Sequence, residues 1–290
     1  MSVPENTATT TGALPLAAEF PSVTKEQWRD LVAGVLRKSG ADVDGASDAP
    51  ESLLTTTTYD GIVIQPLYDS GDDIESGFPG IAPFTRGARP QGAVVDGWDV
   101  RQRHAHPDAA AARQAVLEDL ENGVTSIWLG VGAAGVPVDR IGEVLADVHL
   151  DLAPVTLDAG ADYEAAVAAL LSAYADRDLP DSAVSGNLGV DPLGLAARTG
   201  ERADVASAAR FAAGLAAARP ALRLVVADGT PVHEAGGSEA QELGAAVASG
   251  VAYLRALTEA GLDLADAAAR VEFRFAASAD QFLTIAKLRA

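Results

Sequence analysis

The most informative stretch of the sequence is residues 77–87, which read Gly77-Phe78-Pro79-Gly80-Ile81-Ala82-Pro83-Phe84-Thr85-Arg86-Gly87. Its two prolines have a fixed φ angle, and its three glycines reach backbone conformations that other residues avoid. The backbone is therefore expected to be irregular, and it carries two aromatic side chains and one cation. A combination of this kind in so short a stretch rarely arises by chance, so the stretch is a specific marker and not a generic loop.

Three further blocks lie on either side of this signature. Residues 59–68 read YDGIVIQPLY, residues 233–243 read HEAGGSEAQEL, and residues 285–290 read IAKLRA. Together with the signature, these blocks resemble those of the methylmalonyl-CoA mutase family in the same order. Members of that family are adenosylcobalamin enzymes that rearrange the carbon skeletons of CoA thioesters. The resemblance covers most of the chain.

Composition narrows the class of protein. A chain of 290 residues with 48% hydrophobic residues is able to bury a substantial core. It contains no cysteine, which argues against a small secreted disulfide scaffold and leaves a cytoplasmic location as the expectation. The net charge of −20 opposes binding to nucleic acid. The polar amino terminus does not resemble a signal peptide, and no apolar run reaches the roughly 20 residues of a membrane span.

The first half of the chain divides by composition. Apolar residues recur at spacings of three and four over residues 24–39, behind a Thr24 and Gln27 capping box, which predicts an amphipathic helix. A loop over 40–57 precedes a short strand at about 61–65, and an extended arm follows. We expect three regions: residues 1–50, a polar segment with the helix; 51–106, an extended arm; and 107–290, a partial barrel.

Strands and helices alternate beyond the arm. We expect strands near 124–130, 153–157, 183–188, 222–227 and 271–275. We expect helices near 107–121, 138–147, 161–176, 203–219 and 237–259, and a last one beginning near Ala279. This alternation is typical of an α/β protein with a parallel sheet, either doubly wound or a (β/α)8 barrel. Periodicity leaves both open, and the family resemblance implies the TIM barrel.

The expected barrel is truncated after about five βα units, because relatives continue for hundreds of residues. The family's carboxy-terminal cobalamin-binding domain is expected to be absent, since its Asp-x-His-x-x-Gly motif does not occur in these 290 residues. We therefore expect this chain to bind no cofactor itself.

Positions that carry chemistry in catalytic family members are changed here. The resemblance aligns a substrate-facing tyrosine with Ala93, and a tyrosine and a histidine with Thr230 and Pro231. Proline has no N–H to donate, so it does not replace a histidine that polarises a thioester. A substrate-contacting glutamine is aligned with Gly189. We therefore expect no catalytic residues in this chain, and an interior that is filled or collapsed.

Two weaker site candidates remain. Arg198 matches the family's carboxylate-binding arginine after a shift of one residue, or it is a surface arginine. His233 lies two residues beyond Pro231, where it either replaces the lost histidine or is a solvated or helix-capping residue.

Two patterns point to other functions. Residues Gly130 to Gly135 read GVGAAG after a strand, with Asp158 at the end of the next strand, which is similar to a dinucleotide-binding loop. The alternative hypothesis is a nucleotide- or CoA-binding module that uses this loop. His104 and His106 have a spacing that would suit a metal on a strand, but no third ligand is placed by the sequence, so we expect solvated loop histidines and no metal.

A preserved scaffold with altered chemical positions is typical of a non-catalytic paralogue. The resemblance therefore implies the amino-terminal part of a small (beta) subunit of methylmalonyl-CoA mutase. Its implied partner is the catalytic large (alpha) subunit, which holds adenosylcobalamin and interconverts (R)-methylmalonyl-CoA and succinyl-CoA. Whether the chain counts as an enzyme is left open, and the chain itself is expected to be inactive.

Overall fold

A computed structural model describes residues 20–43, 49–69, 71–72, 77–92 and 97–289. The chain divides into two compact units, residues 1–74 and 75–290. Among the described residues, no helix combines the length and apolarity that crossing a bilayer requires.

The first unit contains the amphipathic helix that the sequence predicts. Helix α1 (Lys25–Lys38) begins after Thr24, whose side chain accepts the Gln27 N–H at 3.3 Å, while the Gln27 side chain accepts the Thr24 N–H at 3.0 Å. This reciprocal pair confirms the capping box. A 3-10 helix, η1 (Pro50–Leu54), follows, and the Arg29 side chain on α1 bonds Glu51 of η1 at 2.5 Å.

A small hairpin completes the described part of this unit. Strand β1 (Thr56–Thr57) pairs antiparallel with β2 (Val63–Ile64). The expected strand at 61–65 corresponds to β2. Neither η1 nor β1 was expected from the loop-like composition of residues 40–57.

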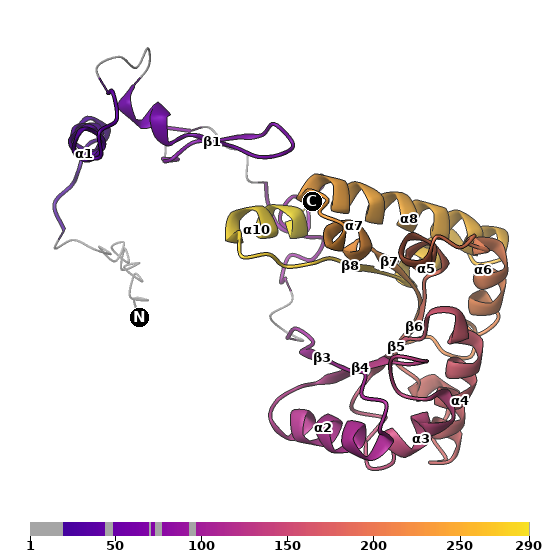
Figure 1. Ribbon diagram of the computed structural model, residues 1–290. Helices are drawn as coiled ribbons and strands as arrows, with labels where there is room; N and C mark the ends of the chain where they lie inside the picture. Colours follow the sequence, from indigo (N-terminus) through magenta and orange to yellow (C-terminus); the bar gives the residue numbers. More distant parts are fainter. Residues whose placement is uncertain (1–19, 44–48, 70, 73–76, 93–96, 290) are drawn as a thin grey trace, which may run out of the picture. The chain divides into compact units, whose positions relative to one another are not determined.

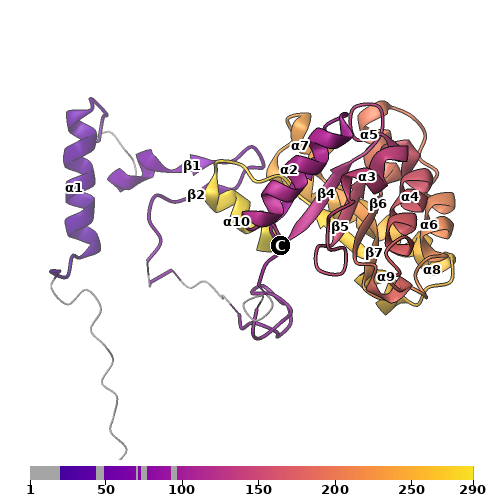
Figure 2. The ribbon, with the colours of Figure 1, turned by 90° about the horizontal axis from the view of Figure 1, so that it is seen from below.

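The second unit is built on a six-stranded parallel sheet in sequence order. Its strands are β3 (Arg101–His104), β4 (Ser126–Gly130), β5 (Val155–Asp158), β6 (Gly186–Val190), β7 (Leu222–Asp228) and β8 (Val271–Arg274). Figure 1 shows the strands along a curved arc, with helices on its convex side. Figure 2 shows β4 to β7 from below, beside α2, α3 and α4. This arrangement confirms the α/β class and the partial barrel of TIM type.

The sequence underestimated the strand number by one. The additional strand is β3, which pairs in parallel with β4 and opens the sheet. Its sequence is Arg-Gln-Arg-His, which has none of the apolar or β-branched residues by which strands are recognised. It forms because its backbone pairs with the edge of β4.

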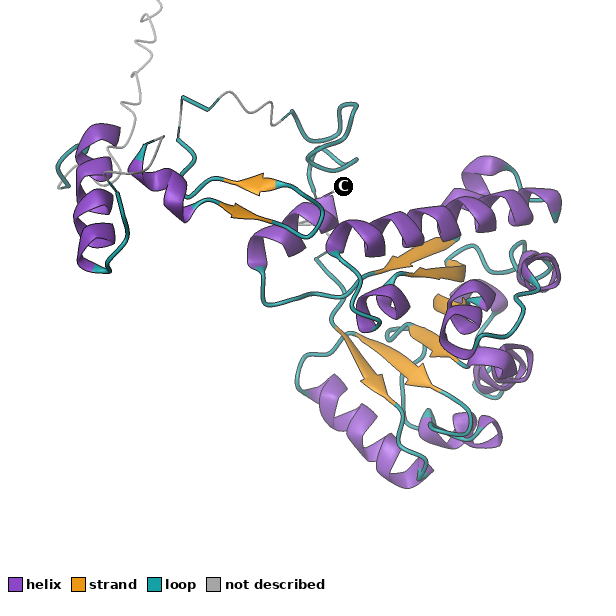
Figure 3. Cartoon of the chain, turned by 45° about the horizontal axis from the view of Figure 1, so that its top comes forward, coloured by secondary structure: helices purple, strands orange, loops and turns teal. Residues whose placement is uncertain are grey.

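Helices connect the strands and cover the sheet. They are α2 (Ala109–Glu121), α3 (Ile141–Val144), α4 (Tyr163–Ala175), α5 (Pro192–Thr199), α6 (Val205–Ala213), α7 (Thr230–Glu234), α8 (Glu239–Glu259), α9 (Leu264–Ala269) and α10 (Gln281–Arg289). Figure 3 shows the longer helices outside the arc of strands. The expected helices correspond to α2, η2 (Val138–Arg140) with α3, α4, α6 and α8, and the last one to α10. Short helices α5, α7 and α9 were not expected.

The core lies between the convex face of the sheet and these helices. Ile127, Leu129, Val155 and Leu157 are fully buried in one apolar cluster with residues of the helices. They alternate along β4 and β5 with residues of the opposite face, as the period of a strand requires. The helix-facing side of the sheet is therefore an ordinary apolar core.

Candidate functional site

Charged residues gather where the strands end. Asp158, Asp228 and Arg274 are the last residues of β5, β7 and β8, and Asp191 follows β6 directly. The carboxyl ends of parallel strands form one edge of the sheet, which is where α/β proteins place their active sites. This edge is therefore the candidate functional site.

Asp228 is the centre of this group. Its side chain is fully buried and is bonded by two guanidinium groups, Arg198 of α5 at 2.6 Å and Arg274 of β8 at 3.0 Å. Thr230 donates to the same carboxylate from its backbone N–H at 2.9 Å and from its hydroxyl at 2.6 Å. Two positive charges and two neutral donors therefore surround one carboxylate.

The electrostatics of this group favour the ionised state. Burial would raise the pKa of Asp228, but the hydrogen bonds from Thr230 and the charges of Arg274 and Arg198 outweigh burial and hold the pKa below its usual range. Burial would likewise lower the pKa of Arg198, yet the Asp228 carboxylate raises it. The group is a stable ion pair network at neutral pH.

Asp191 lies close by in a different environment. Its Oδ1 atom accepts from the Tyr253 hydroxyl at 2.5 Å and from the Gly194 N–H at 2.9 Å. Burial raises the pKa of Asp191, and the nearby Asp228 charge raises it further, against those two hydrogen bonds. Two neighbouring carboxyl groups thus have pKa values shifted in opposite directions.

Side chains of the concave face meet across the interior of the curled sheet. Arg101 of β3 donates to Glu272 of β8 at 2.7 Å, although these are the first and last strands of the sheet. Arg274 of β8 lies over the ring of Trp128 on β4, 4.2 Å from its centroid, and Arg103 lies 5.5 Å from the same ring. Charged and aromatic side chains of distant strands therefore meet inside the curled sheet.

Arg198 is exposed at the surface, and it is also paired. It forms the ion pair with Asp228 already described, and its side chain is about one-third exposed. Its guanidinium is thus already paired with a carboxylate of the chain itself.

The residues aligned with the family's tyrosine and histidine form a turn. Thr230 and Pro231 begin α7, and the Thr230 hydroxyl is bonded to Asp228. His233 lies one turn along α7 with its Nδ1 atom 3.9 Å from a carboxylate oxygen of buried Glu242. The His233 side chain faces this glutamate of α8, and it makes no contact with the Asp228 group that the structure records.

The backbone conformation at Gly189 requires a glycine. Its φ angle is +67°, and a β-carbon built there would lie 1.8 Å from the carbonyl oxygen of Leu157 on β5. The register of β6 against β7 shifts between Asn187 and Val190, which marks an irregularity at this point. No side chain fits here while β5 and β6 approach so closely.

The loop at Gly130 to Gly135 does not form a phosphate cradle. The N–H groups of Val131 and Val136 donate to the backbone oxygens of Asp158 and Gly130 at 2.8 and 2.9 Å. The N–H groups of Gly132 and Gly135 are also used within the loop. A dinucleotide loop instead needs such N–H groups turned toward the ligand at the start of a full helix. Here η2 has three residues and α3 has four.

Asp158, the residue that would bind a ribose in the dinucleotide hypothesis, pairs instead with an arginine of the chain. Its carboxylate lies 3.6 Å from the Arg103 guanidinium. This pair lies on the concave face, where half of the Arg103 side chain remains exposed.

The two histidines are placed differently. His106 is exposed and accepts the Asp108 N–H at 3.1 Å, as a solvated loop histidine would. His104 instead ends β3 and is only 6% exposed, so the expectation of a solvated residue was wrong for it. Burial lowers the pKa of His104 against the opposing charge of Asp119. Within the described residues, no group of three or more His, Asp or Glu side chains is arranged to hold a metal ion.

The signature is an exposed, internally bonded loop. The Gly80 N–H donates to the Gly87 oxygen at 2.8 Å, and a β-carbon at Gly80 would lie 2.5 Å from the Pro90 ring. The Arg289 guanidinium of α10 donates to the Thr85 carbonyl at 2.8 Å. The signature residues are Gly77, Phe78, Pro79, Gly80, Pro83, Phe84, Thr85, Arg86 and Gly87. Ala93, the remaining altered position, lies outside the described residues.

The signature also exposes apolar side chains. Phe78 is 73% exposed, and Ile81 and Phe84 are exposed as well. A monomeric soluble protein usually covers such a group, so the loop has the character of a contact surface.

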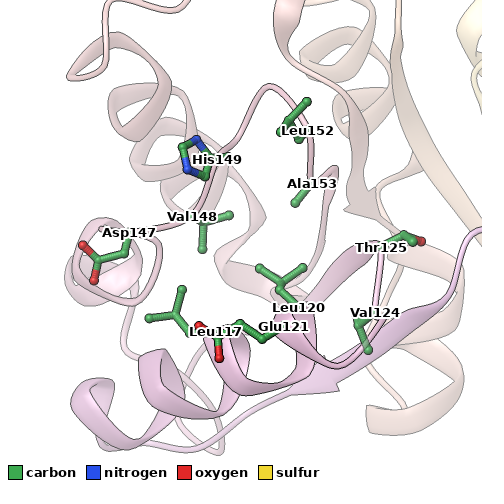
Figure 4. Close-up of a pocket in the computed structure, with 10 residues that line it drawn as sticks. All are labelled: Leu117, Leu120, Glu121, Val124, Thr125, Asp147, Val148, His149, Leu152 and Ala153. Carbon is green, nitrogen blue, oxygen red and sulfur yellow. The ribbon is translucent and has the colours of Figure 1, made fainter.

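A separate cavity lies at the opposite ends of the strands. It has a volume of about 580 Å³ and is formed by the end of α2 and by the loops that lead into β4 and β5. Figure 4 shows Leu117, Leu120 and Val148 on its wall, with Glu121 and Asp147 nearby. Of the aligned positions that the structure describes, Gly189, Thr230 and Pro231, none lines this cavity.

Sequence reasoning missed the residues that dominate the carboxyl edge. Asp228 ends the apolar run LRLVVAD, and a charge at the end of a buried strand is a recognisable signal. Trp128, Arg274 and Glu272 gave no such signal, because their meeting depends on the curvature of the sheet.

Comparison with known proteins assigns the chain to a family. A family model described as methylmalonyl-CoA mutase matches residues 57–130 and 128–290. The chain is 54% identical over 279 residues to the methylmalonyl-CoA mutase small subunit of Streptomyces virginiae, covering 96% of this chain and 45% of that protein. It is 40% identical over 280 residues to the small subunit of Propionibacterium freudenreichii subsp. shermanii, covering 96% and 44%.

The large subunit of Streptomyces virginiae is also similar, with 27% identity over 301 residues, covering 93% of this chain and 40% of that protein. The chain thus spans less than half the length of these relatives. It belongs to the methylmalonyl-CoA mutase family, where its sequence is nearer to the relatives named small subunits than to the one named a large subunit.

Proposed function

We propose that this chain is part of a non-catalytic small subunit that pairs with the catalytic large subunit of an adenosylcobalamin-dependent methylmalonyl-CoA mutase. The large subunit interconverts (R)-methylmalonyl-CoA and succinyl-CoA, and this chain contributes no reacting group. The observation that carries the proposal is the carboxyl edge, where the Asp228 carboxylate accepts from both Arg198 and Arg274. A site whose cations are already paired has no free group to bind a substrate anion.

The same edge does not fit a cobalamin. Arg274 contacts both Trp128 and Asp228, so these three side chains occupy part of the space that a corrin ring would need. We infer that the cofactor is held by the partner subunit.

Exposed apolar side chains support a protein partner. On α1, Leu31 is 67% exposed and Val35 is 66% exposed, although both belong to the apolar stripe of the helix. On the second unit, Phe78 and Ile81 of the signature are exposed as well. These are the candidate contact residues, and a cytoplasmic complex is the setting that we infer.

The test is co-expression with a tagged methylmalonyl-CoA mutase large subunit, followed by affinity purification and a mutase assay with adenosylcobalamin. We expect a one-to-one complex whose activity is unchanged by Pro231→Ala in this chain. Activity that falls with a surface variant of His233, such as His233→Gln, in an intact complex would contradict the non-catalytic role.

A matched pair of variants tests the contact surface. Leu31→Asp with Val35→Asp should weaken the complex by roughly 30-fold or more, because each replaces a candidate apolar anchor by a charge. Asp30→Ser, at an exposed position on another face of the same helix, should leave it unchanged. Equal binding by both variants would place the contact elsewhere.

A further inference from the structure

The side chains around Asp228 are those of an anion-binding site, and the anion that they bind is the Asp228 carboxylate itself. Its donors come from three separate elements: Arg198 from α5, Arg274 from β8, and Thr230 at the start of α7. Guanidinium groups with a hydroxyl and a backbone N–H are the donors that proteins use to bind carboxylate ligands.

The acceptor side of the group is equally specific. The Asp228 side chain is fully buried, and its Oδ2 atom accepts from both arginines while Oδ1 accepts both hydrogen bonds from Thr230. Both oxygens of the carboxylate are therefore in use. The arginines, by contrast, remain partly accessible, with 37% of the Arg198 side chain exposed and 14% of the Arg274 side chain exposed.

The neighbouring carboxylates do not substitute for Asp228. Asp191 is held by Tyr253 and Gly194, and Asp158 lies 3.6 Å from Arg103. Without the Asp228 carboxylate, Arg198 and Arg274 would therefore lose the one acceptor that they share.

We propose that Asp228 is a built-in carboxylate that occupies a latent anion site at the carboxyl edge, and so closes that site to small external carboxylates. The native chain accordingly does not bind formate or acetate there. Removal of the Asp228 side chain opens a cavity of carboxylate size that an external carboxylate fills. This inference concerns the chain by itself, so it holds or fails independently of the subunit proposal.

The test is chemical rescue of thermal stability. Asp228→Ala should lower the Tm by roughly 5–10 °C, because two partly buried cations lose their counter-ion. Sodium formate or acetate should then raise the Tm of the variant by about 3–5 °C at ten times the dissociation constant, relative to sodium chloride at equal ionic strength. The native chain should show no difference between these salts.

Two control variants make the result specific. Asp191→Ala removes a neighbouring buried carboxyl that no arginine holds, so formate should not rescue it. Asp228→Ala combined with Arg198→Ala removes one of the two cations, so its rescue by formate should be weaker than that of Asp228→Ala alone.

Several outcomes would overturn the proposal. Equal effects of formate on the native chain and on Asp228→Ala would mean that the salt acts elsewhere. Rescue of Asp191→Ala to the same extent would have the same meaning. Asp228→Ser opens the same space and keeps a polar group beside Thr230; if neither it nor Asp228→Ala folds in formate, no external carboxylate replaces Asp228, and the site is purely structural.

Discussion

The convex and concave faces of the sheet are made by the same six strands but are held by different interactions. On the convex face, Leu129 and Leu157 are fully buried against helices. On the concave face, Arg101 bonds Glu272 and Arg274 lies over Trp128. Buried apolar area stabilises a fold strongly, whereas paired charges largely offset their own loss of hydration. The convex face therefore accounts for most of the stability, and the concave face decides what fits inside.

The largest effect should come from the convex face. Leu129→Ala leaves a cavity beneath the helices and should reduce the free energy of unfolding by about 2–5 kcal/mol, measured by urea denaturation. Leu152→Ala is the control, because that side chain is 75% exposed, and it should change stability by less than about 0.5 kcal/mol. Similar losses for the two variants would mean that the convex core is not the main source of stability.

An intermediate effect is expected on the concave face. Glu272→Ala removes one acceptor of Arg101 and should cost roughly 1–3 kcal/mol, because Arg101 is three-quarters buried and keeps only Asp99 and Ser126 as partners. Replacing both residues by apolar ones of similar size, Arg101→Met with Glu272→Leu, should recover most of that loss.

Urea denaturation of the single and double variants makes this comparison. If the double variant is as unstable as the single one, the pair contributes net stability, and the contrast between the two faces disappears.

The sequence predicted the convex face far better than the concave face. Apolar runs such as the one in β4 identify strands because burial against helices requires them. Strand β3 was missed since its residues are polar, and it is held by backbone pairing and by the contact of Arg101 with Glu272. These two residues are 171 positions apart, so no local pattern relates them.

The surroundings of the positions aligned with catalytic residues were likewise not predictable from the sequence. The resemblance aligned Thr230 and Gly189 with catalytic residues, but only the structure relates each to its new surroundings. Thr230 bonds Asp228, and Gly189 lies against the backbone of β5. Distances of this kind depend on the register and curvature of the sheet, which a single sequence does not specify.

A smaller effect is expected from pH, because Asp228 and Asp191 at the carboxyl edge should change the stability of the fold in opposite directions as pH rises. The pKa of Asp228 is lowered in the folded chain, so its contribution to stability is present above the ordinary value of about 4 and is lost as pH falls through the folded value. The Tm difference between native chain and Asp228→Asn should therefore shrink as pH falls below about 4.

The pKa of Asp191 is raised, so the sign is reversed. Its ionisation disfavours the folded state, and stability is lost as pH rises from about 4 through the folded value. Asp191→Asn should therefore gain stability relative to the native chain over that rise, as measured by Tm at closely spaced pH values. The same pH trend in both variants would contradict the opposite environments of the two groups.

The smallest expected effect concerns the loop at Gly130 to Gly135. Addition of NAD or CoA at about 1 mM should shift the Tm by less than about 1 °C, since a ligand stabilises only in proportion to its occupancy. The reason is geometric: the N–H groups of Val131, Gly132, Gly135 and Val136 already bond backbone oxygens. A saturable shift of several degrees, abolished by Gly132→Pro in a folded variant, would instead mean that this loop opens for a phosphate. The loop after β4 would then exchange its internal hydrogen bonds for bonds to the ligand.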